Sequence, residues 1–343
     1  MAKKSSYWQK RFELLLDAQF HKGENYLLDL EAQYKIAVDA IEKDIAVWYV
    51  RFAKNNEVSL AEAKQMLRGA ELAEFHWDVK KYIEYGEKNA LDGKWMKQLE
   101  NASARVHISR LESIKLQTQQ TIEKLYGGQL EGMDKLAKEV YQGTYFQTAF
   151  EIQKGFGVGY TLHAIDSNKL GKVIAKPWTA DGANFSSRIW KNKEQLVNTL
   201  HTELTQSIIR GDAPDKAIKA IAKKFNTSKN QAGRLVMTES AFFASAAQKD
   251  CFNELDVERY EIVATLDSKT SPICQEMDGK VFKMSDYEPG ITSPPFHVYC
   301  RSVTVPYFDD NDDDGQRAAR GSDGKTYYVP ADMTYKEWKA KQA

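Results

Sequence analysis

Cysteine is scarce in this chain of 343 residues, which has three. Three cysteines do not make a disulfide framework, so metal binding or simple burial in a reducing compartment are their expected uses. Proline is absent from the first 176 residues. Nothing in that region therefore forces a break in a helix.

Long apolar runs and an excess of one charge are also missing. No apolar run approaches the ~20 residues that span a bilayer, and the basic N-terminus lacks the apolar core of a secretory signal. Basic and acidic residues number 48 each, so the net charge is zero. This balance argues against a nucleic-acid coat, although isolated basic pairs leave room for a weak contact to DNA phosphates.

Sequence signatures of catalysis are missing as well. Neither HExxH nor Gly-x-Ser-x-Gly occurs. Gly155, Gly157 and Gly159 form G-x-G-x-G, which is not the G-x-G-x-x-G of a dinucleotide site, and no lysine with serine or threonine completes a P-loop. We therefore expect that the protein is not an enzyme and that these glycines form a hinge.

Helical periodicity is abundant. Over residues 1–150, apolar residues recur every three or four positions, which predicts a domain of long antiparallel helices. Within it, Trp95 begins a helix that we expect to continue to Leu125 and to stop at Gly127 and Gly128.

The composition changes further along the chain. Residues 151–185 are rich in glycine and predict an irregular linker. Residues 186–308 read as one domain, helical over 186–256 and α+β over 257–308. An acidic run and a short tail follow at 309–343.

The α+β part favours three short strands, expected at 259–266, 280–284 and 303–308. In the tail, Thr334 and Glu337 predict the cap of one last helix. The predicted fold is therefore mainly α, with long antiparallel helices followed by a small C-terminal α+β module that contains a three-stranded sheet.

The segment from Asp267 to Arg301 concentrates the residues that can bind metal. Cys274, His297 and Cys300 supply three ligands of types that zinc or another soft metal accepts. The fourth ligand would be water or a carboxylate from Asp267, Asp278 or Asp286, and we include Asp267 in the predicted site. Two other readings stay open: a pair of buried cysteines beside a histidine bonded to backbone, and a disulfide between the cysteines.

A polar group precedes this segment on a predicted helix. Arg234 and Thr238 lie one turn apart, and Glu239 follows directly. The group is either an ion pair on the helix surface or a buried brace that orients the helix against the small sheet.

Taken in order, these residues resemble the phage head-morphogenesis family, the minor head proteins related to the F protein of phage Mu. The similarity covers about residues 196–307. The matching residues are Ile208 to Asp212, Arg234 to Glu239, Thr265 to Asp267, Thr270 to Pro272, Cys274, Asp278 to Lys280, Phe282, Pro294, Pro295, His297, Cys300 and Arg301. The family pattern usually ends Cys-Arg-Cys, whereas Ser302 occupies the third position here, so a site that used that cysteine would lack one ligand.

The resemblance implies a structural role, as a minor capsid protein of a phage or prophage of a Gram-positive bacterium. Such proteins enter the procapsid in a few copies, associate with the portal and influence DNA packaging or ejection. The expected partners are the portal and other capsid or scaffold proteins, and the expected location is the capsid interior after assembly in the host cytoplasm.

The resemblance also suggests structural residues around the site: Arg234, Thr238, Glu239, Asp278, Gly279, Pro295 and Arg301. Two alternative functions, which belong to other classes of protein, stay open. One is a metal-dependent nuclease or peptidase acting in head maturation, and the other is a DNA-binding module without catalysis.

Overall fold

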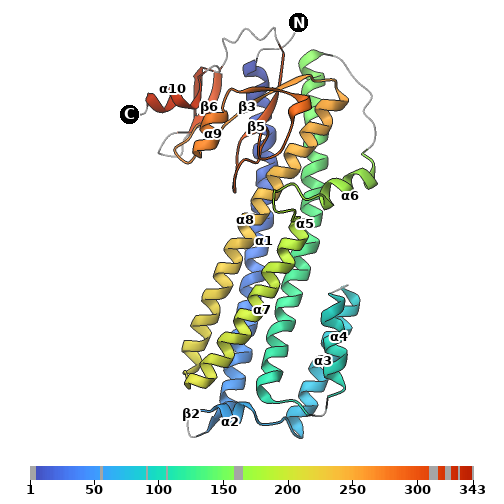
Figure 1. Ribbon diagram of the computed structural model, residues 1–343, viewed down its shortest axis with the longest axis vertical. Helices are drawn as coiled ribbons and strands as arrows, with labels where there is room; N and C mark the ends of the chain where they lie inside the picture. The colour runs from blue at the N-terminus through green and yellow to red at the C-terminus, as the bar shows by residue number, and fades with distance from the viewer. Residues whose placement is uncertain are drawn as a thin grey trace. The chain divides into compact units, whose positions relative to one another are not determined.

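The computed structural model describes residues 5–54, 57–89, 92–105, 107–157, 165–308, 316–320, 326–330 and 333–341. These residues are mainly helical, with a three-stranded antiparallel sheet near the C-terminal end (Figure 1). The predicted fold class is confirmed. The acidic run at 309–314 lies outside the described residues.

The longest helices pack as the periodicity predicts. They are α1 (Ser5–Phe52), α5 (Arg110–Phe156), α7 (Phe185–Arg210) and α8 (Pro214–Glu254). Trp48 donates a hydrogen bond to Gln117 at 2.7 Å, and Gln19 donates one to Gln147 at 2.9 Å. Later residues of α1 thus meet earlier residues of α5, so the two helices are antiparallel.

Internal contacts divide the chain into two compact units. Unit 1 comprises Met1–Leu27, Met133–Phe185 and Arg234–Ala343, and unit 2 comprises Leu28–Gly132 and Ser186–Gly233. One unit boundary falls between Phe185 and Ser186, where the sequence predicted the start of a domain, whereas no unit changes at residue 150. The positions of loops and glycines in the sequence do not predict this division, because three of its boundaries fall inside helices: α1, α5 and α8 each contribute to both units.

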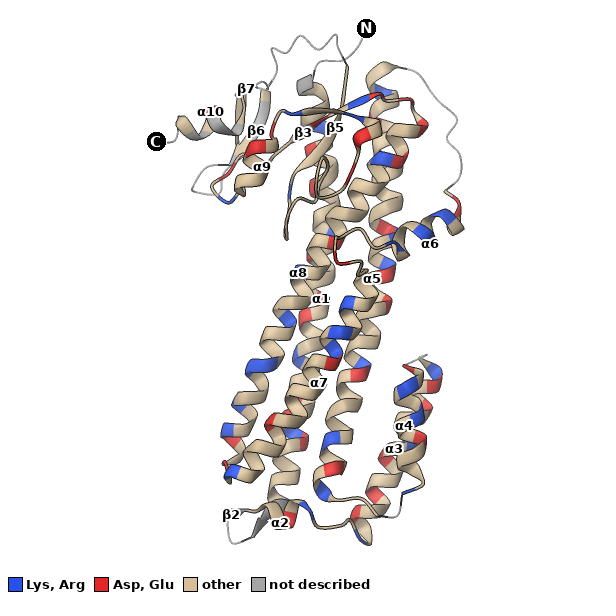
Figure 2. Cartoon of the chain, viewed as in Figure 1, with Lys and Arg blue, Asp and Glu red and all other residues tan. Residues whose placement is uncertain are grey.

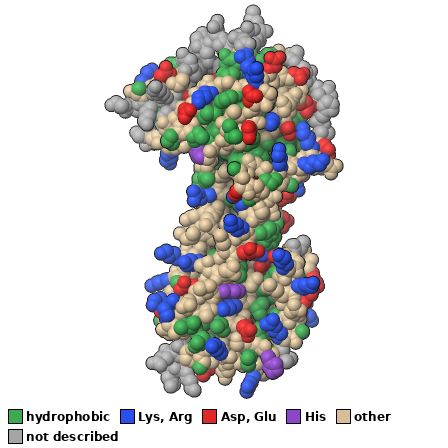
Figure 3. Space-filling view, in the orientation of Figure 1, with side chains coloured by type: hydrophobic (Ala, Val, Ile, Leu, Met, Phe, Trp, Pro, Cys, Tyr) green, Lys and Arg blue, Asp and Glu red, His purple; other side chains and the backbone are tan. Residues whose placement is uncertain are grey.

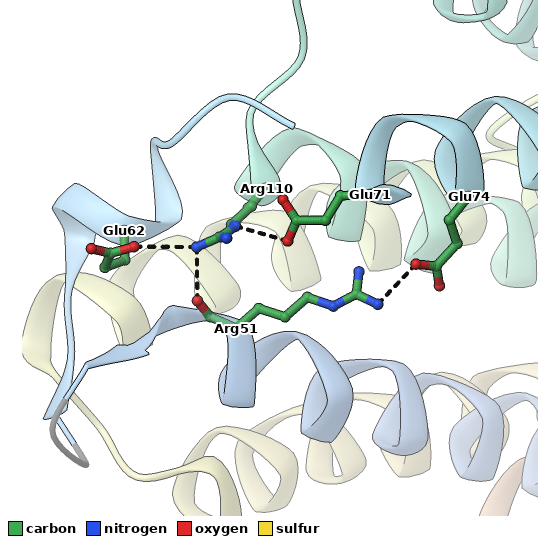
Figure 4. Close-up of polar contacts among 5 residues, drawn as sticks. All are labelled: Arg51, Glu62, Glu71, Glu74 and Arg110. Carbon is green, nitrogen blue, oxygen red and sulfur yellow. Dashed lines mark hydrogen bonds and ion pairs between the residues drawn. The ribbon is translucent and has the colours of Figure 1, made fainter. Parts of the chain in front are cut away.

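Unit 2 contains the shorter elements that follow α1. They are β1 (Ala53–Lys54), β2 (Glu57–Val58), α2 (Leu60–Ala63), α3 (Ala70–Lys88) and α4 (Gly93–Ser103). Figure 4 shows how Arg110 joins them: its guanidinium donates to Glu62 at 3.2 Å, to Glu71 at 3.1 Å and to the carbonyl oxygen of Arg51 at 2.9 Å. Arg51 in turn donates to Glu74 at 2.9 Å. This network ties the end of α1 to α2, α3 and the start of α5.

The prediction of a single helix from Trp95 to Leu125 is wrong. The chain leaves α4 at Ser103, and α5 starts afresh at Arg110, where Ser109 and Glu112 cap each other: Ser109 N donates to the Glu112 carboxylate at 2.8 Å, and Glu112 N donates to Ser109 Oγ at 3.2 Å.

The paired glycines do not end α5 either. A Cβ atom on Gly128 would lie 3.3 Å from the side-chain oxygen of Gln33. Glycine at this position therefore allows α1 and α5 to approach closely within unit 2.

In unit 1, two of the three glycines for which we expected a hinge lie at the end of α5. Gly155 lies under the buried ring of Trp8, and a Cβ there would come within 2.2 Å of that ring. Gly157, with a φ of +69°, follows the last residue of α5, whereas Gly159 is outside the described residues. The expected irregular linker contains the helix α6 (Ser167–Ala175), which Asp166 caps.

The small sheet has the three strands that the sequence predicted. They are β3 (Arg259–Val263), β4 (Val281–Lys283) and β5 (Val303–Tyr307), in the antiparallel order β4-β3-β5. The helix α9 (Pro272–Met277) lies between β3 and β4 in sequence, and a 3₁₀ turn, η1 (Met284–Asp286), follows β4.

The tail is more ordered than the sequence predicted. Strands β6 (Gln316–Arg320) and β7 (Thr326–Pro330) pair as a hairpin, and Ala319 bridges to Leu266. Leu266 and Ala319 share a buried cluster with Val329, Met333 and Trp338. The last helix, α10 (Tyr335–Ala340), has the predicted cap, because Thr334 N and Oγ1 donate to Glu337 at 2.9 and 3.0 Å.

Both basic and acidic residues are spread along the long helices (Figure 2). Among the described residues, no helix combines the length and the apolar character needed to cross a membrane.

Candidate metal centre

The three predicted soft ligands meet in unit 1. Cys274 belongs to α9, while His297 and Cys300 lie in the loop that leads into β5. Cys274 Sγ is 3.1 Å from His297 Nε2 and 3.7 Å from Cys300 Sγ. All three ligand atoms lie within 4.8 Å of one another, so the group can hold a metal ion.

The position of Cys274 is set by the two ends of α9. At the first end, Ser271 Oγ accepts a hydrogen bond from Cys274 N, and Pro272 occupies the first turn, where its missing N–H costs nothing. At the other end, the buried carboxylate of Asp278 accepts from Ala264 N at 2.8 Å. Gly279 then donates to Ile262 O at 2.8 Å with a φ of +76°, which favours glycine.

The distances suit a tetrahedral ion. Two thiolates bound to zinc at about 2.3 Å lie about 3.8 Å apart, and a thiolate and an imidazole nitrogen lie about 3.6 Å apart. The observed separations of Cys274 Sγ from the other two ligand atoms are 3.7 Å to Cys300 and 3.1 Å to His297. A movement of the imidazole by about half an ångström would fit it to the ion. The sulfurs are not bonded to each other, and both cysteines are free.

The imidazole of His297 is held in the tautomer that a metal requires. Its Nδ1 lies 2.7 Å from the carbonyl oxygen of Val298. A carbonyl only accepts, so Nδ1 carries the proton and Nε2 presents its lone pair to the cysteines.

The pKa values of the two cysteines favour one thiolate, which could bind a metal ion. A hydrogen bond from Cys274, with backbone hydrogen bonds at Phe296 and Ser302, lowers the pKa of Cys300 against the opposing effect of burial. The hydrogen bond to Cys300, together with burial, raises the pKa of Cys274. The pair therefore shares one proton, and Cys300 is the better ligand near neutral pH.

Asp267, which we included as the fourth ligand, does not join the group of close ligand atoms found among the described residues. Its two oxygens accept from Arg301 at 2.6 and 2.9 Å, and one also accepts from Lys269 N at 2.9 Å. Burial raises the pKa of Asp267, but the bonds from Arg301 outweigh it and the pKa is lowered. The carboxylate therefore joins Arg301, next to Cys300, to the segment that follows β3.

Glu239 is buried, with 2% of its surface exposed, and accepts from Trp178 Nε1 at 3.0 Å. The ring of Trp178 stacks on Phe242 at a centroid distance of 5.0 Å. The buried-brace reading thus fits Glu239, with a donor, Trp178, from the segment before α7.

Thr238 connects α8 to the loop of the candidate site. Its hydroxyl donates to Arg234 O at 2.7 Å and accepts from Tyr299 N at 3.3 Å. The side chain of Arg234 is exposed. Pro295, next to Phe296, follows a cis peptide bond.

Sequence reasoning missed the role of Tyr287. Its buried hydroxyl lies 2.8 Å from Ser245 Oγ and 3.3 Å from Thr304 Oγ1, so it links α8 to β5 beneath the loop of the site. No local pattern marks this tyrosine, because its partners lie 42 and 17 residues away.

Comparison with known proteins gives one family match, to part of the chain. Searches of curated proteins and of solved structures gave no match to this chain. The family described as Phage Mu protein F like protein matches residues 198–305, about a third of the chain. The chain thus carries, from the second half of α7 to β5, a segment similar to Phage Mu protein F like proteins, and Cys274, His297 and Cys300 lie inside it.

Proposed function

We propose that this protein is a structural minor head protein of a phage or prophage that acts in procapsid assembly by binding and not by turnover. The observation that carries the proposal is the match of residues 198–305 to the Mu F-like family. It is supported by the ligand group of Cys274, His297 and Cys300, which lies within the matched segment.

The proposed partners are the portal and other capsid or scaffold proteins, in the virion. Large apolar side chains on the surface of α1 offer contact area, such as Leu28 and Ile36, of which 65% and 69% are exposed. Figure 3 shows hydrophobic side chains interspersed with charged ones on the face in view, a composition that suits protein interfaces. The proposed consequences of binding are effects on DNA packaging or ejection.

We further propose that the metal is zinc and that its role is structural. Two thiols and one imidazole are soft donors, which select zinc over magnesium or calcium. An ion there would join α9 to the loop before β5, and Asp267 with Arg301 would hold that loop from its other side.

The surroundings of the ligand group support a role without catalysis. A cavity of about 20 Å³ opens beside Cys274 and His297, and none of the side chains that line it is a carboxylate. It holds little more than one water molecule. A hydrolytic centre needs room for a substrate and a general base, which this cavity does not supply.

The test is incorporation into procapsids. The tagged protein is co-expressed with the portal, scaffold and major capsid genes of the same genome, and procapsids are isolated and analysed by mass spectrometry. We expect the protein in a few copies per procapsid, together with the portal. Its absence from procapsids, and from complexes with the portal alone, would refute the proposal.

A plasmid assay separates the enzymatic alternative. The protein is incubated with plasmid DNA and magnesium, manganese or zinc, beside a His297→Ala variant. Intact DNA in every lane is expected. Cleavage that requires both metal and His297 would establish a nuclease instead.

A further inference from the structure

A buried serine without a hydrogen-bond partner lies beside the candidate metal ligands. Ser302 is 4% exposed, and its Oγ has no hydrogen-bond partner. A hydroxyl withdrawn from water without a partner destabilises the folded state, so such groups call for a reason.

The position of Ser302 supplies that reason. Its side chain lies within interaction range of both thiols, Cys274 and Cys300. It also lines the cavity of about 20 Å³ that Cys274 and His297 share. One residue thus faces all the soft donors of the group.

A tetrahedral ion bound by Cys274, His297 and Cys300 still requires a fourth donor. Asp267 is engaged by Arg301, and Asp278 by Ala264 N. Asp286 lies in η1 and accepts from Ser285 at 2.9 Å. None of the three carboxylates lines the cavity, whereas Ser302 does.

We propose that residue 302 occupies the fourth corner of a tetrahedral site for a soft divalent metal, with Ser302 directing its hydroxyl to that corner. The inference rests on the metal site within the proposed function but not on the role in head assembly. The site would then have three strong protein ligands and a weak fourth position. Cysteine at 302 would close it as a site with three thiolates and one imidazole.

Cobalt(II) is the probe, because its spectrum reports both geometry and the number of thiolates. The full chain, reduced and without a polyhistidine tag, is titrated with cobalt and then competed with zinc. We expect tetrahedral d–d bands and thiolate-to-cobalt charge transfer in the native protein. Ser302→Cys should raise the charge transfer per cobalt by about 1.5-fold, because two thiolates become three, and should tighten binding about 10-fold or more.

Ser293→Cys is the matched control. Ser293 is also buried with an unpartnered Oγ, but it lies beside Tyr287 and does not line the cavity. A thiol placed there should change neither the spectrum nor the affinity. Ser302→Ala, which barely alters packing, should weaken cobalt binding several-fold and leave the charge transfer per bound cobalt unchanged.

Three results would overturn the inference. One is a Ser302→Cys protein whose cobalt spectrum and affinity equal those of the native chain. Another is equal cobalt affinity in Ser302→Ala and the native chain, which keeps the test decisive if the cysteine variant does not fold. The third is a native spectrum without thiolate charge transfer, which would reject the metal site itself. Incorporation into procapsids is measured separately, so failure here leaves the proposed function standing.

Discussion

At the scale of single residues, the folded state of unit 1 depends on buried carboxylates that accept hydrogen bonds. Glu239 accepts from Trp178, and Asp278 accepts from Ala264 N. A buried carboxylate without a donor would be unstable in its charged form, so each donor fixes the neighbouring backbone.

Replacing Glu239 by alanine should therefore destabilise the protein by about 2–4 kcal/mol, because Trp178 Nε1 would lose its acceptor and a buried space would open. Glu239→Gln keeps an acceptor oxygen and should lose less. Urea unfolding followed by circular dichroism measures both. The exposed Glu276, which pairs with Lys280 at 3.2 Å, gives the control, and Glu276→Ala should change stability by less than about 0.5 kcal/mol. A loss below 1 kcal/mol for Glu239→Ala would contradict the brace.

The sequence was enough to identify the residue types of the site. It was only partly enough to predict which of these residues contact one another. Cys274, His297 and Cys300 were found because few residue types bind soft metals and the three recur at a known spacing. Asp267 was assigned to the metal because a carboxylate is equally suited to a metal and to a guanidinium. Only the fold brings Arg301 against it, from 34 residues away.

At the scale of secondary-structure elements, glycine marks close packing more often than breaks. Gly155 in α5 supports the ring of Trp8. Gly155→Ala should destabilise the protein by about 1–3 kcal/mol, because the rigid indole is packed against Phe156 and Phe308 and has little room to shift. Gly171, in α6, has nothing within 4 Å of its added Cβ. Gly171→Ala should stabilise the protein by up to about 1 kcal/mol, and thermal unfolding should show the opposite signs. Equal effects would contradict this account.

The contact between α1 and α3 in unit 2 should depend on pH. Burial and the nearby charge of Asp78 raise the pKa of Asp44 to about 6, despite Lys43. The folded state thus binds this proton more tightly than the unfolded chain does, and the group's contribution to stability is lost as pH rises from about 4 through about 6.

Asp44→Asn removes that dependence. It should stabilise the protein at pH 8 by about 1 kcal/mol, less than the full shift implies because the side chain is only partly buried, and should have little effect at pH 4. Urea unfolding at both pH values measures the difference. The exposed Asp39, on the same helix, supplies the matched substitution, Asp39→Asn, measured at the same two pH values. A gain for Asp44→Asn that is equal at both pH values would refute the assignment.

Secondary-structure elements could be predicted where the types and spacing of neighbouring residues determine them. The strands of the small sheet and the cap at Thr334 follow from residue type and spacing, and both are present. The break between α4 and α5 was missed although Ser109 and Glu112 signal it, because the apolar stripe seemed continuous. The β6-β7 hairpin was missed for another reason: Gln316–Arg320 lacks β-branched residues, and Ala319 is buried in a cluster that includes the distant Leu266.

At the scale of the whole molecule, the candidate metal centre belongs to one of two units, so its effect should be local. Removing metal with a chelator should increase hydrogen exchange in peptides that cover residues 265–302, because the ion would otherwise hold α9 to the loop before β5. Exchange in peptides from residues 28–132 of unit 2 should stay unchanged. His297→Ala should reproduce the pattern without chelator. Uniform exposure across both units, or no change in either, would count against a structural ion.

The division of α8 between the two units has a practical consequence for anyone who wishes to excise the Mu F-like segment. Its Ser228 hydroxyl lies 2.5 Å from that of Tyr126, and its Phe252 ring packs on Phe12 at a centroid distance of 5.8 Å. Both partners lie outside residues 198–305. A fragment cut at those limits would expose the apolar surface of α8 to solvent and would aggregate. Transplanting the segment into another protein therefore requires carrying along the stretches of α1 and α5 that shelter it.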